Sequence, residues 1–329
     1  DQNGIQTETY RDLDPAKHLK DTGFILSLPL DGTELLARVW KAEIRGVTGH
    51  TVPVFFLDTF HPENSERHLN LGLTLYGGDD WVRIRQEYLL GVGGVRLLEQ
   101  MGYDVDGLHL NEGHCTFALL EMLGKGWSRE ELAKRVLFTT HTPVPAGHDR
   151  FQWGDVEEVL GELMPKDAKQ LVIDAGDPEN GERISMSHLA VALSGPVNAV
   201  SNLNAWVASS MFADHHIAPI TNGVHHITWT SPAMSELFDT HLEGWKEDPT
   251  KLAHAGRIPT EDLAQSRDKA RKVLRDLVKV GTGVDLESDR LTIGFARRFA
   301  TYKRANLVFS DLERLKQIGS GKIQFVFSG

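Results

Sequence analysis

Short apolar runs that break into polar loops recur along this chain. The clearest pair reads GLHLNEGH and RVLFTTHTPVPAGHDRF, in which the runs lead to His114 and His141. Residues 115–123, between the two runs, have apolar positions at helical spacing, and Ser128 with Glu131 forms a capping box for a second helix. The pattern predicts a strand, a loop, helices, a second strand and a second loop.

The loops after these two runs carry the polar residues of interest. In an open α/β sheet, polar residues just past the carboxyl ends of parallel strands line the ligand crevice. Glu112 and His114 follow the first run, and His141 follows the second. We therefore expect both histidines to face one cleft, although a histidine at a strand end is also often an ordinary loop residue that hydrogen-bonds the backbone.

The rest of the chain alternates between strand-like and helix-like segments. Residues 22–60 alternate apolar and polar positions around Gly32, which predicts short antiparallel strands, and the denser run Val52–Leu57 predicts a buried strand. Apolar residues at helical spacing predict a helix over residues 81–101. Its three glycines, Gly91, Gly93 and Gly94, favour close packing against a neighbouring element. Further strands are predicted at 197–200, 217–221, 291–296 and 323–327, and helices at 155–164, 186–193, 201–212 and 260–280. The last of these is amphipathic, with Gly281 as its stop.

A basic block follows the predicted strand at 291–296. It contains Arg297, Arg298, Lys303 and Arg304 and opens a predicted helix that runs to about Ile318. A helix start offers unpaired N–H groups and the positive end of a dipole, and arginine adds a planar fork suited to phosphate oxygens. The block predicts anion binding. We expect Arg83 and Arg85, in contrast, to lie on a solvated face or to form ion pairs.

Composition narrows the class of protein. The 329 residues suffice for two domains, and a formal net charge of −11 argues against a nucleic-acid partner. The single Cys115 rules out an internal disulfide framework and favours the cytoplasm. No apolar run approaches the roughly 18 residues that would span a membrane. We expect a soluble, cytoplasmic protein with no nucleic-acid or membrane partner.

Five segments resemble the α-glucan phosphorylases, and specifically their shorter bacterial and archaeal branch. They read LYGGDDWVRIRQEYLLGVGGVR, LHLNEGH, FTTHTPVPAGHDRF, PITNGVHHITW and GFARRFATYKRANLVFSDLERL, in the family's order. The resemblance implies an α/β fold of the glycosyltransferase-B type, with two Rossmann-like domains facing a cleft. Residues 1–222 would form the N-terminal domain without its start. Residues 223–329 would form linker helices and the beginning of a truncated C-terminal domain.

The resemblance also implies a reaction. Members of the family are pyridoxal phosphate-dependent, often allosteric glycosyltransferases of carbohydrate metabolism. They convert an α-1,4-glucan or maltodextrin and inorganic phosphate reversibly to glucose 1-phosphate. By resemblance, His141 would contact the transferred glucosyl unit, while Glu112, His114 and Asn222 would line the sugar site. Arg298 would hold the substrate phosphate, and Lys303 would lie beside the phosphate of the cofactor. An asparagine before a glycine, as at Asn222, is also a common turn residue.

The chain departs from the family in three places and covers only part of it. Asn202 and Asn204 stand where the family usually has an arginine and a histidine, and Ala300 stands where many members have a histidine. The glycine-rich opening region is missing, and the lysine that forms the Schiff base with pyridoxal phosphate would lie beyond Gly329. We therefore expect an internal fragment that neither binds the cofactor nor catalyses phosphorolysis by itself.

Alternative functions remain open on the sequence. A nucleotide-sugar-dependent glucan synthase shares the fold and also places an arginine and a lysine on phosphate, and a non-catalytic glucan-binding protein would tolerate the changes at Asn202 and Asn204.

No metal is expected, because the candidate histidines lack a compact ligand spacing and there is one thiol. These histidines are His109, His114, His141 and His148. The oligomeric state also stays open, with a homo-oligomer among the alternatives.

Overall fold

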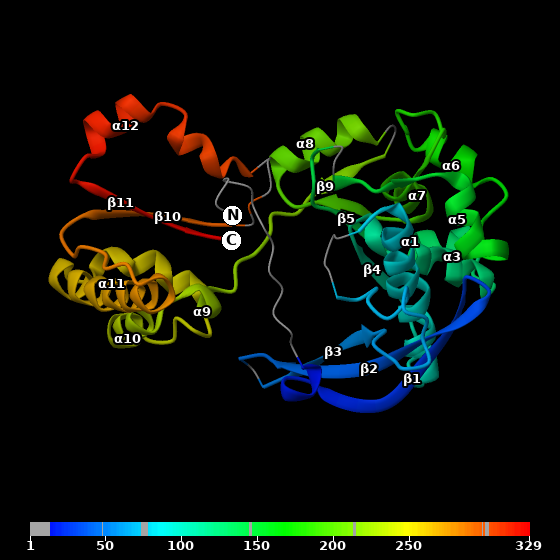
Figure 1. Cartoon of the computed structure of the whole chain (residues 1–329), viewed down its shortest axis with the longest axis horizontal. Helices are drawn as coiled ribbons and strands as arrows, with labels where there is room; N and C mark the ends of the chain where they lie inside the picture. Colours follow the sequence, from blue (N-terminus) through cyan, green and yellow to red (C-terminus); the bar gives the residue numbers. More distant parts are fainter. Residues whose placement is uncertain are drawn as a thin grey trace. The chain divides into compact units, whose positions relative to one another are not determined.

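The chain forms two compact units, Asp1–Gly223 and Val224–Gly329 (Figure 1). The computed structural model describes residues 14–47, 49–73, 78–144, 147–212, 215–297, 299 and 303–329. Each unit combines helices with a parallel sheet. The protein is therefore of the α/β class, as the sequence predicts. The assignment of the two ranges to an N-terminal and a C-terminal domain of the resembled family stays a prediction.

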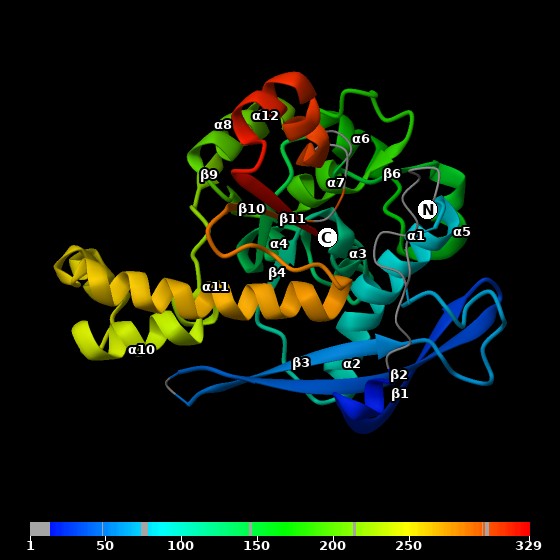
Figure 2. The same cartoon turned by 60° about the vertical axis from the view of Figure 1, so that its left-hand side comes forward.

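An antiparallel sheet opens the described part of the first unit. It consists of β1 (Lys20–Leu30), β2 (Thr33–Arg45) and β3 (Thr51–Asp58) in the order β1-β2-β3 (Figure 2). Asp31 and Gly32 both have positive φ, at 54° and 71°, the conformation that a two-residue hairpin turn requires. The predicted antiparallel strands and the break at Gly32 are confirmed.

The strand predicted at residues 52–57 is confirmed as β3, but the prediction that it is buried is wrong. β3 lies at the edge of its sheet, and Val52, Val54 and Phe56 are 51%, 37% and 44% exposed. Side chains alternate between the two faces of a strand, and only the face of Phe55 and Leu57 packs against the core. A dense apolar run alone does not show that both of its faces are covered.

The predicted helix over residues 81–101 contains a π-helical turn. α1 (Asp80–Tyr88) continues through η2 (Leu89–Gly93, the π turn) into α2 (Gly94–Gln100). A Cβ on Gly91 would lie 2.7 Å from the backbone nitrogen of Ala118, and one on Gly93 would lie 3.0 Å from Leu28 Cδ1. Close packing therefore explains these two glycines. A Cβ on Gly94 would meet nothing within 4 Å.

A four-stranded parallel sheet forms the centre of the first unit. Its strands are β4 (Leu108–Asn111), β5 (Val136–Thr140), β8 (Val197–Ala199) and β9 (Ile217–Pro219), in the order β4-β5-β8-β9. All four were predicted. Because parallel strands point the same way, the loops that follow them meet at one edge of the sheet.

Helices connect these strands. The capping box of Ser128 and Glu131 is confirmed at the start of α4. The connecting elements are α3 (Phe117–Gly124), α4 (Arg129–Arg135), α5 (Trp153–Leu160), α6 (Ala168–Asp174), α7 (Met186–Leu193) and α8 (Asn202–Met211), with a two-residue strand pair of β6 (Arg150–Phe151) and β7 (Ile184–Ser185).

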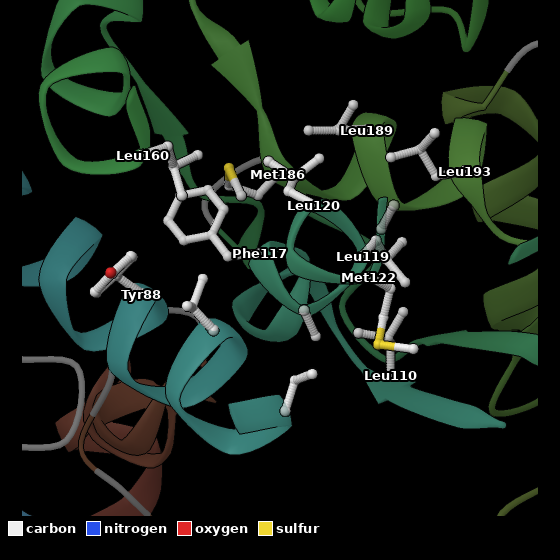
Figure 3. Packing of buried hydrophobic residues seen from close by; sticks show 14 of the residues in the cluster. Tyr88, Leu110, Phe117, Leu119, Leu120, Met122, Leu160, Met186, Leu189 and Leu193 are labelled. Atoms are coloured by element: carbon white, nitrogen blue, oxygen red, sulfur yellow. The ribbon is translucent and has the colours of Figure 1, made fainter. Parts of the chain in front are cut away.

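The core of this unit lies between α1, α3, α7 and β4. Figure 3 shows Phe117 and Leu120 of α3 directed toward Met186 of α7, with Leu119 and Met122 near Leu110 of β4. Phe117, Leu119 and Leu120 are completely buried. Full burial of each such side chain contributes about 1.5–3 kcal/mol, so this contact holds the parallel sheet against its helices.

The second unit contains a helical pair and a two-stranded parallel sheet. Ser266 Oγ of α11 donates to the Ala233 carbonyl of α10 at 2.6 Å, and the two helices lie side by side (Figure 1, Figure 2). The elements are α9 (His226–Trp229), α10 (Pro232–His241), α11 (Thr260–Thr282), β10 (Leu291–Ala296), α12 (Leu312–Gly319) and β11 (Ile323–Ser328).

Two helix predictions in this unit need correction. α11 continues past Gly281 and ends before Gly283, whose φ is +76°, and Val273 and Leu277 on its second half are exposed. The helix predicted to start in the basic block is also wrong. Arg304 has φ +53°, a short 3₁₀ turn spans Ala305–Phe309, and α12 begins separately behind its N-cap Asp311. A left-handed residue cannot continue a right-handed helix.

In the described part of the chain, no helix combines the length and the apolar character that crossing a membrane would need.

The α3 core contact should dominate the stability of the first unit. Phe117→Ala removes a fully buried ring, so we expect it to lower the free energy of unfolding by about 3–5 kcal/mol. Leu203→Ala is the control, because Leu203 is 71% exposed on α8 and should change stability by less than about 0.5 kcal/mol. Urea unfolding, followed through hydrogen exchange of α3 and β4 amides, measures both. Equal effects of the two substitutions would contradict the assigned core.

Candidate functional site

The loops after β4 and β5 are tied together by Glu112. Its main-chain N–H donates to the Thr139 carbonyl at 3.0 Å. Its carboxylate oxygen Oε2 accepts a hydrogen bond from the main-chain N–H of His141 at 3.1 Å. The structure therefore brings Glu112 and His141 together at the sheet edge where the sequence places the candidate site.

Glu112 adopts a backbone conformation that side chains rarely take. Its φ is +69° and its ψ is −179°, a region populated almost only by glycine and costing about 1–3 kcal/mol. Next to it, a Cβ on Gly113 would lie 2.9 Å from Ser187 Oγ, so the chain passes close to α7. Such strain persists only where the surroundings fix it, and it concentrates at functional sites.

The second carboxylate oxygen of Glu112 is a buried acceptor. Glu112 is 5% exposed, and its Oε1 has no hydrogen-bond partner among the described residues. A buried acceptor without a donor is costly, by about 1–3 kcal/mol. A ligand hydroxyl or a water would supply that donor, which fits a site for a polyhydroxylated molecule.

Asn204 connects this pair to the next strand. Its Oδ1 accepts from the Val200 N–H at 3.2 Å, just after β8, and its Nδ2 lies at donating distance, 3.5 Å, from the His141 carbonyl. Asn204 is buried. The asparagine that replaces the histidine of the resembled family therefore contacts the backbone of His141. Asn202 is exposed, and nothing in the structure explains its substitution.

The loop that carries His141 is anchored by His148. One ring nitrogen of His148 lies 2.8 Å from Ser187 Oγ, and the other lies 2.8 Å from the Thr142 carbonyl. His109 is similarly engaged, with its Nε2 2.7 Å from Thr139 Oγ1. These hydrogen bonds hold both histidines within the scaffold, and neither histidine belongs to the group of possible metal ligands found in the described part of the chain.

Asn222 follows β9 at the same edge of the sheet. Its main-chain N–H donates to the carbonyl of Val200, which follows β8, at 3.1 Å. Asn222 therefore lies two strands away from His141, which follows β5. Its side chain is exposed. This position is compatible with the predicted contact to a sugar, which stays a prediction.

His114 belongs to a cluster of ionisable groups on α1 and the loop before β6. Its Nδ1 lies 3.0 Å from Asp149 Oδ2, and the same oxygen lies 2.6 Å from Arg83 Nη2. Arg83 Nη2 is also 3.5 Å from Glu87 Oε1. Of the two alternatives predicted for Arg83 and Arg85, a solvated face or ion pairs, the structure shows ion pairs, because Arg83 pairs with Asp149 and the buried Arg85 pairs with Asp31.

The sequence did not point to Glu87 or Asp149. Glu87 occupies a helical position four residues after Arg83, and Asp149 lies between His148 and β6. The spacing of Arg83 and Glu87 is the one available signal, because residues four apart share a helix face. Asp149 has no comparable local signal.

The cluster shifts the protonation of its members. Hydrogen bonding to Asp149, and then to Glu87, raises the pKa of His114 to about 9. Burial raises the pKa of Glu87 to about 8. Burial would also raise the pKa of Asp149, but its hydrogen bonds with His114 and Glu87 and the charge of Arg83 hold it well below the usual range. At pH 7, two cations therefore face one anion.

Glu87, His114 and Asp149 also have the residue types of a metal site. One ligand atom from each lies within 4.8 Å of the others. The guanidinium of Arg83 already contacts this group, so it supplies the positive charge that a metal ion would bring. We assign no metal centre to the cluster, and the expectation of a metal-free protein stays a prediction.

The predicted phosphate residues lie in the second unit. Lys303 is half-buried there. Arg298 lies outside the residues that the structure describes. The prediction that Arg298 faces the sugar residues across a cleft therefore stays a prediction, as does the one that His114 and His141 face a single cleft.

The chain is similar to several phosphorylases. It is 33% identical to maltodextrin phosphorylase of Thermococcus litoralis, over 97% of this chain and 42% of that protein. It is 32% identical to glycogen phosphorylase of Aquifex aeolicus, over 88% of this chain and 47% of that protein. It is 29% identical to glycogen phosphorylase of Mycobacterium tuberculosis, over 96% of this chain and 43% of that protein. The chain thus spans less than half the length of these relatives. No protein-family model matches it.

The protonation of His114 should depend on Asp149. We expect the His114 ring to titrate near pH 9 and Asp149→Asn to return its pKa toward the usual value of about 6.5. Since the folded-state pKa is raised, the stability that the charged ring contributes is present in full below about pH 6.5 and is lost as the pH rises through about 9. NMR titration of the histidine rings measures both pKa values.

A second carboxylate provides the control for that titration. Asp167→Asn removes a surface carboxylate that pairs with Arg129 at 2.5 Å and should leave His114 unchanged. A His114 pKa near 6.5 in the unmodified chain would refute the assigned cluster.

Asn204 should matter for stability, and Asn202 should not. Asn204→Ala leaves the Val200 N–H without its acceptor, so we expect a loss of about 1–3 kcal/mol in the free energy of unfolding. Asn202→Ala changes an exposed residue on the same helix and should fall within about 0.5 kcal/mol. Urea denaturation compares the two variants, and indistinguishable values would rule out a stabilising hydrogen bond between Asn204 and the Val200 N–H.

Proposed function

Because the chain belongs to the α-glucan phosphorylase family, we propose that the complete protein catalyses the reversible phosphorolysis of an α-1,4-glucan or maltodextrin to glucose 1-phosphate. The observation that carries this proposal is the similarity to a maltodextrin phosphorylase over 97% of the chain. The buried, strained Glu112 beside His141 supports it independently, because it offers an acceptor to a hydroxyl-rich ligand.

The proposed fold of the complete protein is the glycosyltransferase-B arrangement. In it, two Rossmann-like domains face a cleft, with residues 1–222 in the first domain and residues 223–329 in the linker helices and the start of the second. The parallel sheets of both units support this assignment. Strand ends in the first domain would then hold the sugar, and Arg298 and Lys303 in the second would bind the phosphates.

On the sugar side, the main chain of His141 has the central role. Its carbonyl would favour the positive charge that develops at the anomeric carbon, and its side chain would contact the transferred glucosyl unit. Asn204 lies within hydrogen-bonding distance of this carbonyl and Glu112 accepts from the N–H, so the peptide units on both sides of the His141 Cα are oriented before the substrate binds. His114 and Asn222 would complete the sugar site.

On the phosphate side, Arg298 would hold inorganic phosphate and Lys303 would lie by the cofactor. Two phosphates about 5 Å apart repel by roughly 3 kcal/mol for each pair of unit charges at an effective dielectric of about 20, so cations must lie between them. Lys303 has the charge that a phosphate requires, and its partial burial strengthens the attraction. When bound, pyridoxal phosphate supplies a phosphate group for proton relay. The lysine that would tether it is not among residues 1–329.

The two other functions receive less support. A nucleotide-sugar-dependent synthase and a non-catalytic glucan-binding protein both fit the fold. The relatives, however, are named maltodextrin and glycogen phosphorylases. A glucosyl acceptor assay with nucleotide sugars and a phosphorolysis assay with maltodextrin distinguish the classes.

The phosphate role can be tested in the complete protein with Arg298→Ala. We expect phosphorolysis of maltodextrin to fall by at least about 100-fold while glucan affinity changes less than about twofold, because the guanidinium binds the anion and not the sugar. Release of glucose 1-phosphate and calorimetric binding of maltodextrin measure the two effects.

The neighbouring arginine provides a matched control. Arg297→Ala removes the same charge from an exposed side chain and should retain most of the activity. If Arg298→Ala leaves the apparent affinity for phosphate unchanged, the assignment of the phosphate site fails.

A further inference from the structure

The first turn of α7 lies between the two loops of the candidate site. Ser187 is completely buried, and its Oγ would lie 2.9 Å from a Cβ on Gly113, in the loop after β4. The same oxygen lies 2.8 Å from Nδ1 of His148, near the end of the loop after β5. One hydroxyl therefore lies against both of the loops that carry Glu112 and His141.

Two further contacts tie the start of α7 to these loops. Thr116 Oγ1 lies within donating distance of the Gly113 carbonyl, at 2.7 Å, and of the Met186 carbonyl, at 3.0 Å. The main-chain N–H of Met186 donates to the carbonyl of Asp149, next to His148, at 3.1 Å. Thr116 and Met186 are completely buried. Moving either loop away from α7 would leave buried polar groups without partners, which is costly.

His148 closes the loop that His141 opens. Its Nε2 lies 2.8 Å from the carbonyl of Thr142. A Cβ on Gly147 would collide with the Thr142 side chain, so the two ends of the loop lie against each other. The His148 ring is 6% exposed and meets the Phe212 ring edge-on, with the centroids 6.0 Å apart. Packing and hydrogen bonds together therefore fix this histidine.

The hydrogen-bond partners assign the state of the His148 ring. A carbonyl oxygen can only accept, so Nε2 carries the proton that is donated to Thr142. In the neutral ring Nδ1 is then an acceptor, and the Ser187 hydroxyl is its donor. The ring thus passes the fixed position of α7 on to the main chain of the loop.

Three consecutive peptide groups around His141 are held by side chains. Glu112 accepts from the His141 N–H at 3.1 Å, and Asn204 Nδ2 lies 3.5 Å from the His141 carbonyl oxygen. His148 adds a donor to the carbonyl of the next residue, Thr142. Rotation of the Thr142 peptide group would turn the His141 carbonyl with it, because the two groups share the Thr142 Cα. The contact of His148 therefore bears on the group that the proposed reaction uses.

We propose that His148, itself held by Ser187, is a positioning residue that keeps the His141 carbonyl directed at the anomeric carbon of the bound sugar. His148 is buried, so it acts through His141 and not on the sugar. A displacement of about 1 Å at such a group can cost about 100-fold in rate. The inference rests on the proposed phosphorolysis and extends it from the residues that would contact the sugar to those that hold them.

The kinetics of the complete protein with His148→Ala and His148→Gln test this role. Alanine removes the donor to the Thr142 carbonyl, whereas the terminal amide of glutamine places an N–H close to the position of Nε2. We expect kcat for phosphorolysis of maltodextrin to fall by about 30-fold or more with alanine and to return to within about threefold with glutamine. Calorimetric affinity for maltodextrin should change by less than about threefold in both, because the loss is confined to the transition state.

His188 provides the matched control. It is buried on the same helix, its ring lies 4.9 Å from the Phe212 ring, and its Nε2 lies 3.1 Å from the Met211 carbonyl, outside both loops. His188→Ala should lower the melting temperature about as much as His148→Ala and leave kcat within about threefold. Equal losses of kcat in the two alanine variants would overturn the proposal. So would a glutamine variant at position 148 that recovers none of the loss.

Hydrogen exchange separates this inference from the proposed reaction. In the complete protein, a peptide covering residues 141–149 should exchange about 10-fold faster or more in His148→Ala than in the unmodified protein. His148→Gln and His188→Ala should stay near the unmodified rate. If the unmodified protein shows no phosphorolysis, the proposed function fails, and the exchange rates still decide whether His148 holds the loop. Unchanged exchange in His148→Ala would refute the inference.

Discussion

The hydrogen bond between the Glu112 carboxylate and the His141 N–H is the interaction on which the candidate site depends. It joins two strand ends that the sheet places side by side, and it requires Glu112 to hold a conformation with φ at +69°. The strain of about 1–3 kcal/mol is sustained by the packing of α3 and α7 around the sheet. Asn204 and His148 then fix the same loop from the other side. Rigidity at His141 is thus a property of the whole unit.

Most of the fold follows from local patterns in the sequence. The four parallel strands, the hairpin at Gly32 and the capping box of α4 are each specified by a few adjacent residues, and all are confirmed. The wrong predictions concern features that depend on neighbours distant in sequence. Whether residues 52–57 are covered depends on what packs on the outer face of β3, and the left-handed backbone of Arg304 has no signature in its side chain.

In the candidate site, too, local sequence patterns identify some residues, and others are recognised only from neighbours distant in sequence. His114 and His141 stand out because each follows an apolar run, whereas the partners that set the charge of His114 come from α1 and from the loop before β6. A buried carboxylate such as Glu87 is identified by its surroundings and not by its neighbours in sequence. Burial disfavours the ionised form of such a carboxyl and raises the pKa of Glu87 to about 8, while the partners of Asp149 keep that carboxyl ionised. Arg83, Glu87, His114 and Asp149 must therefore be treated as one unit.

The most direct test of this account is the phosphorolysis rate of the complete protein with Glu112→Ala, compared with Glu112→Gln. Alanine removes the acceptor of the His141 N–H, whereas glutamine keeps an oxygen at similar reach. We predict that kcat/KM for maltodextrin and phosphate falls by about 100-fold or more in the alanine variant, since displacing the His141 loop misplaces the sugar. The glutamine variant should recover most of that loss. An alanine variant with the activity of the unmodified protein would contradict the role assigned to this hydrogen bond.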